Sequence, residues 1–177
     1  AIPTYLINYP VITNKYSSRV IRKIYDQGNC EIGTHIHPWN TPPFEESICA
    51  KNSFICNLPQ ELARRKLVKL HNKIKDYMGI EPICFRAGRW GFGQTVASCI
   101  NELGYLIDTS ITPFSDWTKE EGPDFTNAPY LPYCFEPDHI LSKDVNGGLW
   151  EIPPTIGFLQ HKFDRCAKIR KWILEQI

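Results

Sequence analysis

Residues 58–88 read LPQELARRKLVKLHNKIKDYMGIEPICFRAG, and this stretch decides the fold class. Its first part predicts a helix, because Leu62, Leu67, Leu70 and Ile74 fall mostly on one helical face and Gly79 is a typical helix stop. The short apolar run at 82–88 then predicts a strand that enters a glycine-rich turn. A helix that leads directly into a buried strand is typical of an α/β protein.

The same alternation extends in both directions along the chain. Strands are predicted at 2–10, 30–36, 105–110 and 148–154, and helices at 14–29, 93–104 and 163–177. Residues 113–148 are rich in proline and predict an irregular segment. Strands that alternate with helices are joined by crossovers and run parallel, so we expect either a barrel or an open doubly wound sheet.

The composition is that of an ordinary globular domain. The 177 residues are 42% hydrophobic and 22% charged, which fits one domain spanning 1–177. The net charge of +1 gives no bias toward nucleic acid, and no apolar run approaches the roughly 20 residues of a membrane span. Seven cysteines without a CxxC pair favour a reducing compartment such as the cytoplasm.

Polar residues follow four successive predicted strands. His35 and His37 end the first of these strands, and Arg86, Asp108 and Glu151 end the next three. Both alternative α/β architectures place their functional site at the carboxyl ends of the strands. A fold needs no such set for its own stability, so we interpret this rim as an active site.

The two histidines at the start of this rim have the spacing of a metal site. Residues i and i+2 of a strand point to the same face, so both imidazoles can reach one ion. Imidazole is the commonest ligand of zinc, and a catalytic zinc usually has three protein ligands. The pair leaves one ligand to be found, for which a carboxylate is expected. The alternative is two histidines that only form hydrogen bonds in a loop.

Arg86, Asp108 and three tryptophans complete the candidate rim. Arg86 follows an apolar strand, where a charge needs a partner, so we expect it to hold an acidic group in the site or in a structural ion pair. Asp108 is either a site carboxylate or a turn acceptor. Trp39, Trp90 and Trp117 lie in rim loops, where they suit the apolar faces of sugar rings or pack the loops.

Together these motifs resemble the polysaccharide deacetylase (NodB-homology) family of metal-dependent amidohydrolases. The similar segments are PTYLINYP at 3–10, GNCEIGTHIHP at 28–38, CFRAGRWGFG at 84–93 and GYLIDTSITPFSDW at 104–117. The histidines of that family usually lie four residues apart, whereas here they lie two apart. The family's paired aspartates are expected before Ala1, and its late histidine motif after Ile177, so we expect an internal piece of a longer protein.

The resemblance implies a fold, a cofactor and a reaction. The fold would be a partial, distorted (β/α) barrel, incomplete at both ends. His35 and His37 would bind a divalent metal, with zinc first among candidates, and the third ligand would lie outside this chain. Arg86 would orient the aspartate base, and Asp108 would belong to the catalytic site.

The implied reaction is the removal of acetyl groups from N-acetylated sugars in a carbohydrate substrate, and the piece alone would be inactive. Two alternatives remain open at this point. One is an allantoinase-like hydrolase acting on a small amide or ureide. The other is an inactive relative that binds carbohydrate through the aromatic rim.

Overall fold

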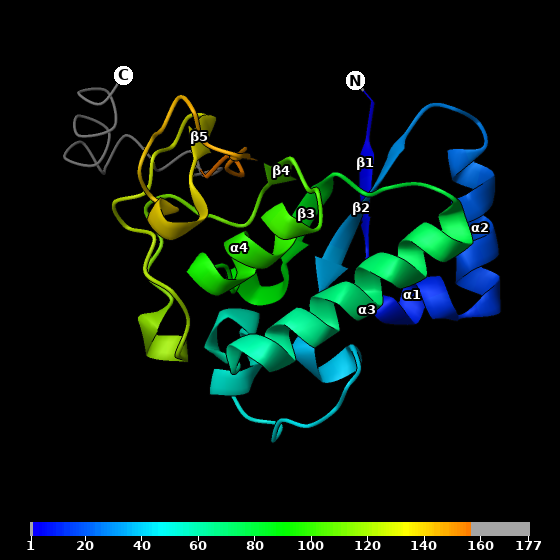
Figure 1. Ribbon diagram of the computed structural model, residues 1–177, viewed down its shortest axis with the longest axis horizontal. Helices are drawn as coiled ribbons and strands as arrows, with labels where there is room; N and C mark the ends of the chain where they lie inside the picture. The colour runs from blue at the N-terminus through cyan, green and yellow to red at the C-terminus, as the bar shows by residue number, and fades with distance from the viewer. Residues whose placement is uncertain (1, 157–177) are drawn as a thin grey trace, which may run out of the picture.

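The computed structural model describes residues 2–156 of the chain, and the predicted helix at 163–177 lies outside them. Within the described part, six strands form one sheet: β1 (Thr4–Ile7), β2 (Glu31–Ile36), β3 (Cys84–Ala87), β4 (Ile107–Asp108), β5 (Tyr133–Phe135) and β6 (Leu149–Glu151). Their spatial order is β1-β2-β3-β4-β6-β5, as Figure 1 shows in part. All neighbours pair in parallel except β5, which is antiparallel to β6. Sequential parallel order is that of a barrel sheet rather than a doubly wound one.

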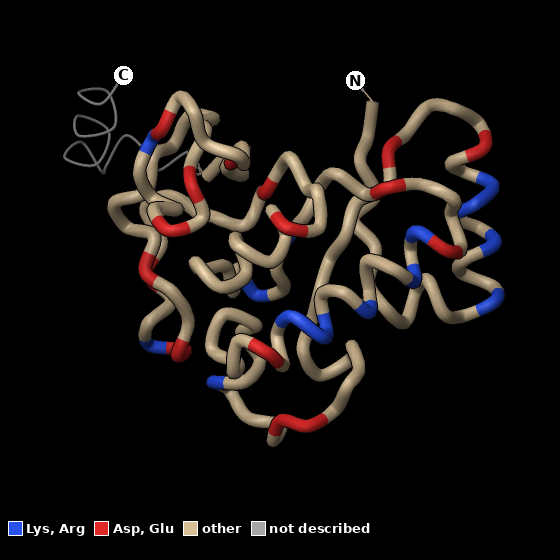
Figure 2. Tube along the Cα trace, viewed as in Figure 1, with Lys and Arg blue, Asp and Glu red and all other residues tan. Residues whose placement is uncertain are grey.

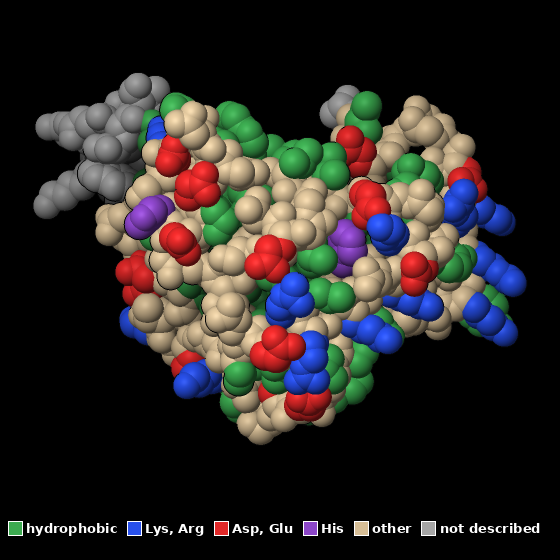
Figure 3. Space-filling model, viewed as in Figure 1, with side chains coloured by type: hydrophobic (Ala, Val, Ile, Leu, Met, Phe, Trp, Pro, Cys, Tyr) green, Lys and Arg blue, Asp and Glu red, His purple; other side chains and the backbone are tan. Residues whose placement is uncertain are grey.

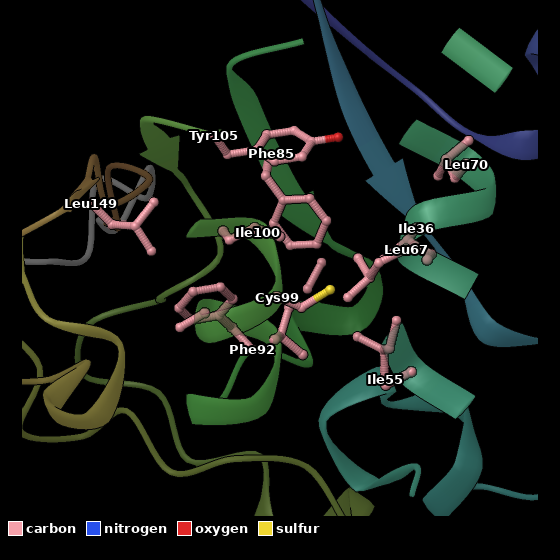
Figure 4. Close-up of a cluster of buried hydrophobic side chains, with 14 of the residues drawn as sticks. Ile36, Ile55, Leu67, Leu70, Phe85, Phe92, Cys99, Ile100, Tyr105 and Leu149 are labelled. Atoms are coloured by element: carbon pink, nitrogen blue, oxygen red, sulfur yellow. The ribbon is translucent and has the colours of Figure 1, made fainter. Parts of the chain in front are cut away.

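Between residues 2 and 156, four α-helices accompany this sheet, and two of them cover its buried face. They are α1 (Tyr9–Thr13), α2 (Lys15–Tyr25), α3 (Gln60–Met78) and α4 (Gln94–Glu102). The core lies between the sheet and the helices α3 and α4, where Leu67, Phe85 and Ile100 are fully or almost fully buried (Figure 4). The helical pattern of residues 58–79 is confirmed, and Gly79 ends α3 with a φ of 65°.

The predicted first strand is too long at its carboxyl end. The strand ends at Ile7, because the side chain of Asn8 accepts a hydrogen bond from the Val11 amide (3.2 Å) and caps α1. Pro10 lies in the first turn of that helix, where it needs no hydrogen-bond donor. The proline therefore belongs to a helix start rather than to a strand end.

The segment 113–148 is not wholly irregular. It contains β5, together with two short 3-10 helices, η5 (Thr118–Glu120) and η6 (Pro137–His139). A three-residue strand among prolines shows no period that a sequence pattern can detect. Two further 3-10 turns matter for the site: η1 (Pro38–Asn40) follows β2, and η4 (Gly88–Trp90) follows β3.

Charged side chains are unevenly distributed over the surface. Lysine and arginine gather on α2 and along α3, while aspartate and glutamate predominate in the segment 113–148, at the left of the view (Figures 2 and 3). Several of the basic side chains are neutralised locally, as in the ion pairs Arg22–Asp26 and Arg64–Glu102. Exposed pairs of this kind contribute about 0–1 kcal/mol each to stability. No helix in residues 2–156 combines the length and the apolar composition needed to cross a membrane.

Candidate functional site

The register of the parallel strands divides the candidate residues between two faces of the sheet. His35 pairs with Arg86 across β2 and β3, so these two side chains share one face. Phe85 pairs with Asp108, which in turn pairs with Glu151. These three side chains lie on the other face, where they are fully buried beneath the helices.

The two histidines meet at the carboxyl end of β2, as predicted. Their Nε2 atoms are 2.9 Å apart, and their rings make an edge contact with centroids 4.5 Å apart. The Nδ1 atom of His35 lies 3.0 Å from the main-chain carbonyl oxygen of Arg86. A carbonyl can only accept, so Nδ1 carries the proton and Nε2 of His35 presents its lone pair to His37.

Both imidazoles are held neutral. Burial lowers the pKa of His35 below its ordinary value, and the charge of Arg86 lowers it further. Burial lowers the pKa of His37 to about 4, and a second positive charge beside the His35 ring and the Arg89 guanidinium is unfavourable as well. A metal ion binds the neutral form of imidazole, so this environment keeps both rings ready for coordination at neutral pH.

The ring of His37 occupies a narrow slot. A Cβ atom at Gly88 would lie 2.1 Å from Nδ1 of His37, so only glycine fits on that side. The indole of Trp39 packs on the ring, with centroids 4.3 Å apart. Nδ1 of His37 is buried and has no hydrogen-bond partner in the described part of the chain. Packing on both Gly88 and Trp39, together with the single hydrogen bond between the Nε2 atoms of His37 and His35, therefore fixes the ring.

Arg86 lies on the same face as His35 but finds a different partner from the carboxylate expected. Its Nε donates to the carbonyl oxygen of Thr109 (3.1 Å), and one terminal nitrogen donates to Oγ1 of Thr109 (2.8 Å). Its guanidinium carbon also lies 5.3 Å from the ring centroid of Trp90. Sequence reasoning missed Thr109, although its place one residue after Asp108 puts it on the face of Arg86.

Asp108 does not line the open rim, and the prediction that it does is wrong. It is fully buried, and its two carboxylate oxygens accept hydrogen bonds from the amide (3.1 Å) and the hydroxyl (2.6 Å) of Ser110. Burial raises the pKa of Asp108. Its role in the structure is to anchor the turn after β4 on the covered face of the sheet.

Glu151 lies beside Asp108 and is also unable to reach the histidines. Its Oε1 accepts a hydrogen bond from the Ile111 amide (3.2 Å), while burial and then the neighbouring charge of Asp108 raise its pKa well above the ordinary range. Neither carboxylate supplies the third ligand, because residues 2–156 contain no cluster of three His, Cys, Asp or Glu side chains able to hold a metal ion.

The three tryptophans have different surroundings. Trp39 is 42% exposed and forms one wall of a cavity of about 290 Å³, which is also lined by Ile48, Ala50, Ser53 and Arg89. Trp90 is half-buried under Arg86. Trp117 packs against the core, and its indole N–H donates to Oγ1 of Thr112 (2.9 Å), so its polar edge is used within the protein.

Comparison with known proteins relates this fold to the carbohydrate deacetylases. No protein-family model and no curated protein sequence matches the chain. Among solved structures, a protein from Mycobacterium smegmatis that is classed as a polysaccharide deacetylase matches with a TM-score of 0.56 at 19% identity. The match covers 87% of this chain and 41% of that protein, so the chain spans less than half of its length.

Two further structures match at lower scores. The Xyl-CE4 domain of a multidomain xylanase from the hindgut metagenome of Trinervitermes trinervoides has a TM-score of 0.45 at 15% identity, covering 68% of this chain and 52% of that one. A mutant CE4-family pseudoenzyme with restored activity has a TM-score of 0.37 at 16% identity, covering 89% and 47%. The fold argument rests on the first match. The chain shares the α/β fold of the polysaccharide deacetylases, which confirms the predicted fold class.

Proposed function

We propose that this chain forms part of a metal-dependent deacetylase that removes acetyl groups from N-acetylated sugars. The observation that carries the proposal is the approach of the two neutral imidazoles, whose Nε2 atoms lie 2.9 Å apart. Two nitrogen ligands of one tetrahedral zinc, each about 2.0–2.1 Å from the ion, lie about 3.3–3.4 Å apart, so moving the rings apart by about 0.4 Å would let both reach one ion. The fit covers two ligands, and the third is expected outside this chain.

His35 is suited to be the more rigid of the two ligands. The hydrogen bond from Nδ1 to the carbonyl oxygen of Arg86 fixes its tautomer and its ring orientation, as is usual for a metal-binding histidine. His37 would be the second ligand, held between Gly88 and Trp39. When bound, the metal would lower the pKa of a water molecule to about 7 and polarise the acetyl carbonyl group.

Arg86 would supply fixed positive charge on the same face as the histidines. Two of its N–H groups are used by Thr109, which sets the plane of the guanidinium, and a guanidinium has five such donors in all. The remaining donors are suited to hold the carboxylate of a general base or the oxygen of a substrate. The partly exposed Trp39, beside its cavity, would contact a sugar ring.

The test is to purify the longest protein that contains residues 1–177 and to measure zinc binding and the release of acetate from an N-acetylated chitin oligomer. We expect activity that is lost after dialysis against a chelator and restored by zinc. Full activity in metal-free protein would contradict the proposal. Binding of the oligomer without hydrolysis would favour the inactive carbohydrate-binding alternative, and hydrolysis only of small ureides would favour the allantoinase-like one.

A further inference from the structure

Lys66 lies on the buried side of α3 and is fully inaccessible to solvent. A buried ammonium group is strongly unfavourable unless it is paired and hydrogen-bonded. The pattern of α3 requires an apolar residue at this position, between Ala63 and Leu70 on the core face. The lysine therefore requires an explanation beyond helix formation.

Four oxygen atoms surround the Nζ atom of Lys66. They are the carbonyl oxygens of Pro38 (3.1 Å), Thr41 (2.7 Å) and Pro43 (2.6 Å), and Oε1 of Glu46 (2.8 Å). All four belong to the loop 38–46, which follows β2. An ammonium group has three hydrogens, so these oxygens share all of its donor capacity.

The loop has few other means of satisfying these oxygens. Pro38, Pro42 and Pro43 carry no N–H group, so the loop cannot form a regular series of main-chain hydrogen bonds within itself. The Glu46 side chain is only 7% exposed, which leaves Lys66 as its close counter-charge. The Pro38 carbonyl oxygen also accepts from the Thr41 amide (3.3 Å). Removing the ammonium would therefore deprive the carbonyl oxygens of Thr41 and Pro43 and the Glu46 carboxylate of their partner, each at a cost of about 1–3 kcal/mol or more.

The loop that Lys66 closes carries one wall of the His37 slot. Pro38 follows His37 directly, and Trp39 packs on the His37 ring with centroids 4.3 Å apart. The opposite wall at Gly88 belongs to η4 and is set independently by β3. Trp39 belongs to the same loop whose oxygen atoms contact Lys66, so the helix side of the loop is held by this lysine.

We propose that Lys66 is a positioning residue, whose ammonium group acts as an internal cation that holds the loop 38–46 closed and Trp39 against His37. The contact between Trp39 and His37 does not depend on the proposed function. The further consequence, that Lys66 maintains metal affinity, rests on the proposed function of the histidines.

The neighbouring residue Arg65 provides a matched control. It makes two hydrogen bonds to the carboxylate of Glu45, at 2.6 and 2.5 Å, so it also ties α3 to the same loop. That pair is about half exposed, however, and it reaches no main-chain oxygen of the loop. Arg65→Met therefore removes one contact between the helix and the loop and leaves the four oxygen contacts of Lys66 unchanged.

The test compares wild type, Lys66→Met, Arg65→Met and the double variant Lys66→Met/Glu46→Met. The double variant also replaces Glu46, so no buried carboxylate is left without its counter-charge. It provides a folded protein for the test if the single variant Lys66→Met does not fold. NMR measures the NOE between the indole of Trp39 and the ring of His37, and competition with a chromophoric chelator measures the affinity for zinc. We expect the NOE to disappear in both Lys66 variants, with a loss of at least about tenfold in zinc affinity, and to persist in Arg65→Met with affinity within about twofold of wild type.

A folded Lys66 variant that keeps both the NOE and the zinc affinity would overturn the proposal. The wild-type protein offers a second measurement that needs no variant, since a caged ammonium group exchanges its protons slowly and gives an observable Nζ resonance. Fast exchange of the Lys66 ammonium would also overturn it. If the wild type binds no zinc, the proposed function fails, while the NOE and the exchange rate still decide whether Lys66 closes the loop.

Discussion

The Nδ1 atom of His35 and the main-chain carbonyl oxygen of Arg86 lie 3.0 Å apart, across the parallel pair β2–β3. This contact joins the two motifs that the sequence places 51 residues apart. It uses the main chain of Arg86, so the guanidinium remains available for Thr109 and Trp90. One strand pairing thus fixes the tautomer of the first histidine and the position of the arginine together.

Replacing either histidine of the pair should abolish metal binding. We expect His35→Ala and His37→Ala each to weaken zinc affinity by about 100-fold or more, because each removes one of the two proposed ligands. His139→Ala is the matched control, since this histidine lies in η6 and is exposed. The measurement is a zinc competition titration. An unchanged affinity in both site variants would exclude the pair as a metal site.

A side chain at position 88 should displace His37. We expect Gly88→Ala to cost about 1–3 kcal/mol of stability and to lower zinc affinity, because the new Cβ would lie 2.1 Å from the ring and 2.5 Å from the carbonyl oxygen of Ile36. The control is Gly28→Ala, where φ is 72° and no atom lies within 4 Å. That variant should lose about 1 kcal/mol from backbone strain and keep its zinc affinity. Denaturant unfolding and zinc titration distinguish the two outcomes.

The hydroxyl of Tyr105 should stabilise the covered side of β2. It lies 2.7 Å from Oγ1 of Thr34 and 3.3 Å from Nδ1 of His71, and all three groups are buried. Tyr105→Phe should therefore lower the free energy of unfolding by about 1–3 kcal/mol, because two buried polar groups lose a partner. Tyr16→Phe, at a position 68% exposed, should change stability by less than about 0.5 kcal/mol. Equal unfolding midpoints for the two variants would contradict this assignment.

The buried carboxyls should make the fold less stable as the pH rises. Burial raises the pKa of Glu151 and of Asp108, so the folded state binds more protons than the unfolded state above the ordinary carboxyl pKa of about 4. Their stabilising contribution is then complete below pH about 4 and is lost as the pH rises through the folded-state values. Glu151→Gln keeps a neutral group there and should gain on the order of 1 kcal/mol over wild type at pH 8, relative to pH 5.

Thermal unfolding at the two pH values checks this expectation. The exposed Glu102→Gln is the control, since its carboxylate lies in a solvated ion pair with Arg64. Its effect on stability should be small and nearly the same at both pH values. A difference between wild type and Glu151→Gln that does not change with pH would show that Glu151 is charged in the folded state throughout.

The elements whose apolar residues recur regularly over a whole segment were predictable from the sequence. The helix at 58–79 and the strands at 30–36 and 82–88 depend on spacing within one segment, and the structure has them within two residues of the expected bounds. The approach of His35 to His37 follows from the same alternation. These features need no knowledge of how distant segments pair.

The sequence could not decide toward which face of the sheet the side chain at each strand end points. Asp108 ends its strand, as Arg86 does, but the pairing of Phe85 with Asp108 turns its side chain to the covered face. The register of a two-residue strand is set by contacts with its neighbours, and a shift of one residue reverses every side chain. Thr109 was missed for the same reason, and β5 was missed because three residues among prolines are too few to show a period.

The slot between Gly88 and Trp39 has a consequence for the ancestry of this chain. Every replacement of a glycine adds at least a Cβ, which at position 88 would meet both the ring of His37 and the main-chain carbonyl oxygen of Ile36, at 2.1 and 2.5 Å. Loss of the ring removes the first contact and leaves the second, so position 88 stays restricted even where residue 37 changes. Among the descendants of one gene, a side chain at 88 should therefore be accompanied by loss of the ring at 37, whereas a glycine at 88 is expected with or without the histidine.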